Sequence, residues 1–250
     1  MKLNGNTILI IGGSGGIGLA MAERFLNNGS EVIISSNDDE KLEIAKKKFP
    51  QLHTIYCDIS DEADRTRLYS EVVKEFPKLN VLFNCAGIQV RSNFSNGQYH
   101  WDTMKQELAV NLEAPMHFSL LFLPHLSNVE NAVIINISSD LAFRVPIFAP
   151  CYGATKAGLH SFTYSLRVQT EPLGISVYEI LPPAVNTDLC APGIHTFGVD
   201  VDLFADEVLK SLAAGEPEIG YGGNLEMTLM PRREIEKIAL EAWEQRKTKI

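Results

Sequence analysis

The stretch that most constrains the fold is residues 7–19, which read TILIIGGSGGIGL. It begins with a short apolar run typical of a buried strand and continues into a cluster of glycines. The residues after the glycines favour an amphipathic helix, with Leu19, Ala20, Phe25 and Leu26 on its buried side. A strand, a glycine turn and a helix in this order predict a doubly wound α/β fold. In such a turn the glycine backbone can approach a phosphate group at the helix N-terminus.

The glycine spacing leaves two other interpretations open. Gly12, Gly16 and Gly18 give G-x-x-x-G-x-G, which also fits a simple tight turn between a strand and a helix. The same stretch satisfies G-x-S-x-G, in which Ser14 is the nucleophile of a serine hydrolase. That nucleophile would follow the first strand, before any strand that supplies an oxyanion loop. No sequence signal ties a downstream histidine or aspartate to Ser14.

Composition and charge narrow the class of protein. The chain has 250 residues, is 45% hydrophobic and carries a net charge of −9, as expected for one globular α/β domain. The negative charge disfavours partners such as nucleic acid or an anionic membrane. The N-terminus lacks a signal-peptide pattern and no apolar run is long enough to cross a bilayer, so we expect a cytoplasmic protein. The four cysteines are scattered, which predicts no metal site and no disulfide.

Strand and helix patterns alternate along the chain. Strands are predicted at residues 7–11, 31–35, 52–57, 80–84, 132–137, 175–181 and 218–221. Helices are predicted at residues 16–28, 38–49, 60–76, 100–126, 152–171, 202–213 and 231–249, with Pro115 bending the fourth or marking its later start. This alternation predicts a single domain over residues 1–250, a Rossmann-type doubly wound parallel sheet of about seven strands with helices on both faces. The long loop 182–201 is expected to act as a substrate lid.

Three side chains near the middle of the chain point to proton chemistry. Ser139 follows a predicted central strand, at the sheet edge where such folds bind ligands. Tyr152 and Lys156 are four residues apart on a predicted helix, so they share a face. A nearby ammonium is expected to lower the pKa of the phenol, which suits a general acid/base. Alternatively, Tyr152 and Lys156 form a surface pair, Ser139 only ends a strand, and Asn111 bonds to backbone.

Taken together, these motifs resemble those of the short-chain dehydrogenase/reductase family. The matching residues are Gly12-x-x-x-Gly16-x-Gly18, Asn84-Cys85-Ala86-Gly87, Asn111, Ser139, Tyr152-x-x-x-Lys156 and Pro182-Pro183-Ala184-Val185-Asn186-Thr187. A closer resemblance is to the oxidoreductases named after the teichoic-acid D-alanylation operon, through Ala149-Pro150-Cys151-Tyr152 and His195-Thr196-Phe197-Gly198 among other stretches. The resemblance implies an NAD(P)(H)-dependent enzyme that interconverts an alcohol and a carbonyl by hydride transfer. A dinucleotide-binding sensor without turnover is the alternative on the same fold.

The resemblance also implies roles for particular residues. Tyr152 would exchange a proton with the substrate oxygen, Lys156 would tune the phenol and hold the nicotinamide ribose, Ser139 would orient the carbonyl and Asn111 would hold a water in a proton relay. The cofactor would be bound by Gly12, Ser14, Gly16, Ile17, Gly18, Ser36, Asn37, Asp58, Ile59, Asn84, Ala86, Gly87, Tyr152, Lys156, Pro182, Val185 and Thr187.

Departures from the family pattern bear on the cofactor. Relatives that prefer NADP usually carry a basic residue at the position of Gly15 or Asn37, and those that prefer NAD carry an acid at the position of Ser36. This chain has neither, and we favour NADP(H) slightly over NAD(H). The first glycine follows Ile11 where the family usually has threonine, which removes a hydroxyl near Asn84.

The expected partner is a small carbonyl or alcohol substrate. Residues 89–99, 141–150 and 187–200 should enclose it in an apolar pocket whose main charge is Arg144. His195 is expected to be a loop residue with no role as ligand or base. The resemblance further implies a homodimer or homotetramer, formed through the helices at 100–126 and 152–171.

Overall fold

The computed structural model describes residues 1–247 of the chain and contains one parallel sheet of seven strands in the order β3-β2-β1-β4-β5-β6-β7. The strands are β1 (Thr7–Ile11), β2 (Glu31–Ser36), β3 (His53–Tyr56), β4 (Val81–Asn84), β5 (Val133–Ile137), β6 (Ser176–Ile180) and β7 (Glu218–Ile219). The order reverses beside β1, where the chain crosses from one half of the sheet to the other. This confirms the predicted doubly wound fold.

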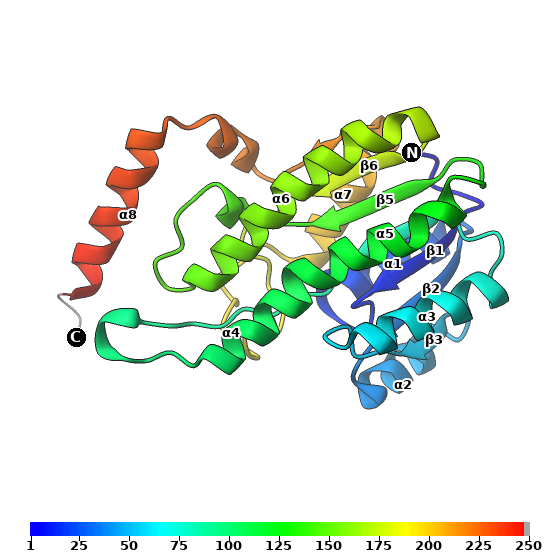
Figure 1. Cartoon of the computed structure of the whole chain (residues 1–250), viewed down its shortest axis with the longest axis horizontal. Coiled ribbons are helices and arrows are strands. Elements are labelled where there is room, and N and C mark those ends of the chain that lie inside the picture. Colours follow the sequence, from blue (N-terminus) through cyan, green and yellow to red (C-terminus); the bar gives the residue numbers. More distant parts are fainter. Residues whose placement is uncertain (248–250) are drawn as a thin grey trace.

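The helices follow the strands in alternation (Figure 1). They are α1 (Gly16–Asn27), α2 (Asp39–Lys48), α3 (Glu62–Glu75), α4 (Trp101–Leu108), α5 (Ala114–Leu126), α6 (Pro150–Thr170), α7 (Val201–Ala214) and α8 (Arg232–Lys247). Aspartate side chains define three of their starts: Asp38, Asp61 and Asp200 each accept a hydrogen bond from a first-turn backbone N–H. The last two residues of the predicted helix 231–249 lie outside the described residues.

Both faces of the sheet are buried, each against its own set of helices. In β1, Ile8 and Ile10 belong to a core cluster with residues of α1, α2 and α7. Their neighbours Leu9 and Ile11 belong to a second cluster with residues of α3, α5 and α6. Side chains of a strand alternate between the faces of its sheet, so a strand covered on both sides is apolar throughout. This explains the continuous apolar run with which the glycine motif begins.

The long helix predicted at 100–126 is interrupted. It is divided into α4, a π-helical turn at Ala109–Glu113, and α5, which has Pro115 in its first turn. Proline has no N–H to donate to the carbonyl four residues earlier, which here belongs to Asn111. The helix widens at this point, and Asn111 lies within the widened turn.

All seven strands point the same way, so the loops after them gather at one edge of the sheet. Figure 1 shows this edge facing α4 and α8, with the N-terminus at the opposite end of the strands. Across residues 1–247, none of the helices combines the length and apolar character needed to span a bilayer. The site described next lies at the carboxyl edge.

Candidate active site

The glycine turn after β1 depends on backbone contacts that exclude side chains. Gly12 has φ +80° and Gly16 has φ +50°, values that L-residues rarely adopt. A Cβ atom on Gly12 would lie 2.6 Å from the Cα of Ala86, and one on Gly18 would lie 2.3 Å from the carbonyl oxygen of Gly12. The turn therefore packs directly against the loop after β4 and against its own helix.

The N-terminus of α1 is open to a ligand. Its N-cap residue, Gly15, offers no side chain to the first-turn N–H groups, and a Cβ atom there would meet no atom within 4 Å. Unpaired N–H groups at a helix N-terminus bind anions. The close-packed glycines on one side and open space on the other fit the pyrophosphate of a dinucleotide.

One cavity of about 1160 Å³ runs along the carboxyl edge from this turn. It brings together Ser139 and all of the cofactor residues named above except Asn84. Ser36, Asn37 and Asp58 lie around one part of it, and Pro182, Val185 and Thr187 also line it. Ser14, the candidate hydrolase nucleophile, donates a hydrogen bond to the Ser36 hydroxyl at 2.8 Å, and within the described part of the chain its hydroxyl bonds to no histidine or carboxylate.

Asn84 lies behind the cavity wall. Its side-chain N–H donates to Asn136 at 2.8 Å, and Asn136 donates in turn to Thr163 of α6 at 2.9 Å. The Asn84 side-chain oxygen is buried without a hydrogen-bond partner among residues 1–247. Ile11 is its neighbour in the β1–β4 register, where the family's threonine would place a hydroxyl.

Asn111 also lies outside the cavity lining, with its amide bonded to backbone. Its oxygen accepts from the N–H of Ile88 at 2.8 Å, and its nitrogen donates to the Ile88 carbonyl at 2.8 Å and to the Thr155 hydroxyl at 3.2 Å. Both donors are used, which leaves one acceptor position on the oxygen. The amide therefore holds the segment after β4 against α6.

Glu107, one turn before Asn111, is a site residue that the sequence reasoning missed. Its carboxyl is fully buried and accepts from the N–H of Val90 at 2.9 Å, while burial raises its pKa. Glu107 and Asn111 thus bind two alternate residues, Ile88 and Val90, of the segment after β4. The residue between, Gln89, lines the cavity, and its side-chain oxygen has no hydrogen-bond partner within the described chain. The sequence signal that could have identified Glu107 is its spacing of four residues from Asn111, which places the two polar side chains on one face of the predicted helix.

The three proposed proton-handling side chains meet at the cavity wall. Tyr152 and Ser139 are each 5% exposed and Lys156 is 3% exposed. The Ser139 hydroxyl accepts from the N–H of Leu141 at 3.1 Å and interacts with the Tyr152 phenol. The Lys156 Nζ lies 5.6 Å from the centre of the Tyr152 ring and donates to the Ile137 carbonyl at 2.9 Å. Helix α6 and the end of β5 therefore present a phenol, a hydroxyl and an ammonium together.

The expected direction of the Tyr152 pKa is wrong for this structure. Burial raises the pKa of Tyr152, the interaction with Ser139 opposes the shift, and the charges of Asp140 and Glu107 add to it. Burial also lowers the pKa of Lys156 to about 8. The ammonium bonds to backbone and lies beside the ring, so it does not offset the loss of water around the phenol.

A half-buried pair joins α6 to β6 one turn beyond Lys156. His160 Nδ1 lies 2.9 Å from Glu179 of β6, whose side chain is fully buried, and this hydrogen bond raises the pKa of His160. The ring also packs on Phe143, with centroids 4.5 Å apart. His160 was not singled out from the sequence, because only the fold brings Glu179 to it.

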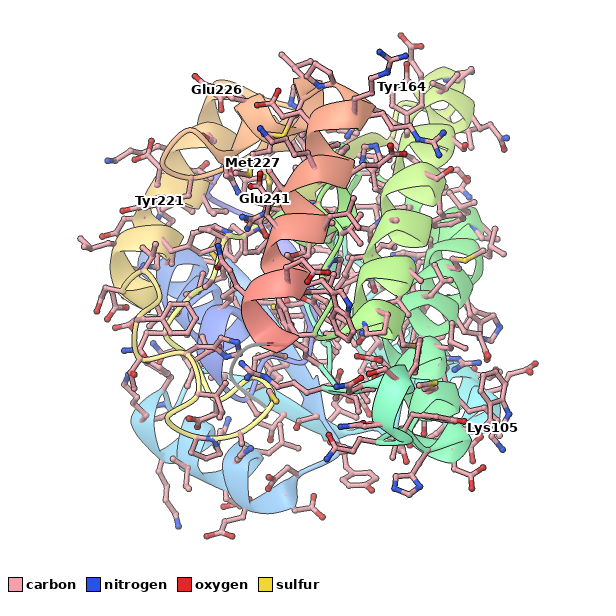
Figure 2. All side chains as sticks on the ribbon, turned by 90° about the vertical axis from the view of Figure 1, so that its left-hand side faces the viewer. Lys105, Tyr164, Tyr221, Glu226, Met227 and Glu241 are labelled. Atoms are coloured by element: carbon pink, nitrogen blue, oxygen red, sulfur yellow. The ribbon has the colours of Figure 1, made fainter. Side chains whose placement is uncertain are left out.

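The substrate side of the cavity is largely apolar. The expected loops contribute Leu141, Val145, Ile147, Phe148 and Phe197, and Arg144 is ion-paired with buried Asp140. His195 also lines the cavity, and its Nδ1 is buried without a partner among residues 1–247. Helix α8 adds a wall that the sequence reasoning did not anticipate (Figure 2). The sequence signal that could have revealed it is the helical spacing of the apolar residues 235, 238, 239 and 242, which places them on one face of the helix.

Comparison with known proteins places this architecture in a family. The family model described as "short chain dehydrogenase" matches residues 6–195, which include the glycine turn, Ser139, Tyr152 and Lys156. The chain belongs to the short-chain dehydrogenase family. It is an oxidoreductase of that family, with the fold that binds nicotinamide dinucleotides.

Individual relatives agree with this assignment. The chain is 41% identical over 224 residues to "Uncharacterized oxidoreductase DltE" of Bacillus subtilis, covering 88% of this chain and 89% of the relative. It is 31% identical over 212 residues to "Short-chain reductase protein NovJ" of Streptomyces niveus, covering 83% and 79%. The first match confirms the closer resemblance to oxidoreductases of the D-alanylation operon.

Solved structures confirm the fold. A short-chain dehydrogenase from Sphingobium yanoikuyae in complex with NADPH superposes with a TM-score of 0.80 at 22% identity, covering 98% of this chain and 95% of that one. One from Burkholderia phymatum in complex with NAD gives 0.84 at 18% identity, covering 94% and 96%. These proteins bind different nicotinamide cofactors, so the shared fold does not select one.

Proposed function

We propose that the protein is an NAD(P)(H)-dependent oxidoreductase that interconverts an alcohol and a carbonyl, with Tyr152 as the general acid/base. The observation that carries the proposal is the meeting of Tyr152, Ser139 and Lys156 on the wall of the cavity that begins at the glycine turn. A nicotinamide dinucleotide held by that turn would supply or accept the hydride.

Tyr152, Ser139 and Lys156 would transfer the proton and position the substrate oxygen. The raised pKa keeps the Tyr152 phenol protonated at neutral pH, so it can donate a proton to a developing alkoxide. Ser139, on the same cavity wall as that phenol, orients the substrate oxygen beside it. Lys156 contributes positive charge close to the ring and tethers α6 to the end of β5 through Ile137. In the oxidising direction, the same phenol must first lose its proton, which burial opposes.

Replacement of Tyr152 by phenylalanine tests the proposal. Tyr152→Phe removes the proton donor and keeps the ring, so it should lower kcat by about 10²–10⁴ in a panel of carbonyls with NADPH or NADH, while the Kd of the nucleotide stays within about twofold. The matched control is Tyr164→Phe, on the same helix but 57% exposed and labelled in Figure 2, which should retain full activity.

Other outcomes decide between the alternatives. Nucleotide binding with no Tyr152-dependent turnover of any carbonyl would support a dinucleotide-binding sensor. Labelling of Ser14 by a serine-reactive fluorophosphonate would support the hydrolase.

We also propose a slight preference for NADP(H) and a homo-oligomer. Lys41 lines the cavity beside Ser36 and Asn37, where its charge would attract an additional phosphate, although Asp38 lies 3.6 Å from its Nζ. Leu120 of α5 and Val168 of α6 are 56% and 57% exposed, consistent with an interface through these helices. Competitive titration with NADH and NADPH tests the first proposal, and light scattering coupled to gel filtration tests the second.

A further inference from the structure

Helix α8 differs from the other helices in what its apolar residues contact. Among the described residues, neither core cluster contains a residue of α8. Ile235, Ile238, Ala239 and Ala242 instead line the cavity that contains Tyr152 and Ser139. These positions repeat at helical spacing, so they form one row on a single face.

The opposite face of α8 is polar. Its ion pairs, Arg232 with Glu236 and Lys237 with Glu241, are exposed, and the apolar residue on this side, Leu240, is 65% exposed. Figure 2 shows the helix lying across the front of this end of the molecule. The helix is therefore amphipathic, with its apolar face toward a cavity and not toward the core.

A second, smaller cavity places α8 on the substrate side. Trp243 lines it together with Leu141, Val145 and Pro146, which follow Ser139, and with Gly153 and Ala154 beside Tyr152. The helix thus lies next to the segment that holds the reacting groups. The residues that this segment contributes to the main cavity, which α8 also lines, include the apolar Leu141, Val145, Pro146, Ile147 and Phe148.

We propose that α8 is a specificity wall, and that the substrate is a carbonyl or alcohol carrying a large apolar substituent that lies between α8 and residues 141–148. The proposal rests on the proposed function, because it assigns a substrate class to the same site. Apolar surfaces facing each other across a cavity are stabilised by an apolar ligand that removes both from water. A short, polar carbonyl would leave the α8 row in contact with solvent.

A series of ketones from 2-butanone to 2-decanone tests this. In the wild type, kcat/KM with NADPH should rise about fourfold with each methylene until the wall is covered. Ile235→Asn should flatten this dependence and lower kcat/KM about tenfold for 2-decanone, with a much smaller loss for 2-butanone. Leu240→Asn, on the outer face, is the matched control and should retain the wild-type dependence. Equal dependence on chain length in I235N and wild type would overturn the proposal.

A second variant tests the wall without introducing a polar group that could disturb folding. Ala239→Leu adds apolar bulk to the row without a polar group, so it should move the optimum to a shorter ketone. An unchanged optimum would contradict the wall.

A binding measurement separates this proposal from the proposed function. The chain has two tryptophans, so Trp101→Phe leaves Trp243 as its only one. Titration of W101F alone with 2-decanone should give a saturable change in fluorescence, which 2-butanone at equal concentration does not give. If 2-decanone gives this change but no ketone is turned over, the role of α8 in binding an apolar ligand is supported and the oxidoreductase function is rejected. No difference between the two ketones would reject the wall.

Discussion

The two ends of the active-site cavity are built in different ways. The end at the glycine turn, called here the phosphate end, has a wall made of main-chain atoms. Gly12 and Gly18 leave no room for a Cβ atom, and the strand β1 that precedes the turn is buried on both faces. At the substrate end the wall is made of side chains from loops and from α8, which takes no part in either described core cluster. The first end is fixed by backbone geometry, whereas the second is free to vary with the side chains that line it.

Among the variants that test this difference between the two ends, Gly12→Ala should have the largest effect on stability and nucleotide binding. The methyl group would meet Ala86 at a residue with φ +80°, so we expect a loss of stability of about 2–3 kcal/mol and much weaker nucleotide binding. Urea unfolding and NADPH titration measure both. Gly15→Ala is the control for stability, because its Cβ atom meets open space. Equal stability of the two variants would mean that backbone packing does not fix this end.

The half-buried pair of His160 on α6 and Glu179 on β6 should show a smaller, pH-dependent effect. The pKa of His160 is raised in the folded protein, so the charged pair stabilises it fully below the ordinary histidine pKa, and this contribution is lost as pH rises through the raised value. His160→Asn should therefore cost about 2 kcal/mol at pH 6 and less at pH 8. Chemical unfolding at both pH values checks this.

The exposed pair of His53 and Glu31 supplies the comparison for that measurement. The His53 Nε2 and a Glu31 carboxylate oxygen lie 3.5 Å apart with both side chains nearly half exposed, so His53→Asn should change stability by less than about 0.5 kcal/mol. A difference between pH 6 and pH 8 that is as large in H53N as in H160N would contradict a special role for the buried pair.

The smallest effect is expected for cofactor choice, which depends on side chains at the phosphate end. Ser36→Asp places a carboxylate at the cavity wall and should shift the ratio of Kd values about tenfold toward NADH, by attracting ribose hydroxyls and repelling a phosphate. Asn37→Arg should shift it about tenfold toward NADPH. Fluorescence titration with both nucleotides measures the ratio. If both variants keep the wild-type ratio of Kd values, residues other than Ser36 and Asn37 determine the choice between NADH and NADPH.

The difference between the two ends also explains what the sequence predicted. The apolar run of β1 and the glycines after it are local signals, because burial on both faces and close backbone approach each restrict the residues at those positions. The order of strands and helices followed from the same patterns. The motif residues Ser139, Tyr152 and Lys156 were placed together because each stands at a strand end or on one helix face.

What the sequence did not predict depends on contacts between distant segments. Glu179 meets His160 only after β6 and α6 pack, and Glu107 meets Val90 only once the loop after β4 folds back. The direction of the Tyr152 pKa was wrong because the spacing to Lys156 gives a neighbouring charge but not the degree of burial. The role of α8 was missed because its apolar row indicates a buried face without saying what lies opposite.

We propose that folding itself holds Tyr152 protonated, ready to donate a proton, where the glycine turn and the substrate loops meet. The direct measurement is an ultraviolet absorbance titration of tyrosinate in the nucleotide-free protein, taken as the difference between wild type and Tyr152→Phe. Burial predicts no difference up to about pH 10, the ordinary tyrosine pKa. The appearance of one tyrosinate near neutral pH would contradict this proposal and would show that Lys156 lowers the pKa of the phenol.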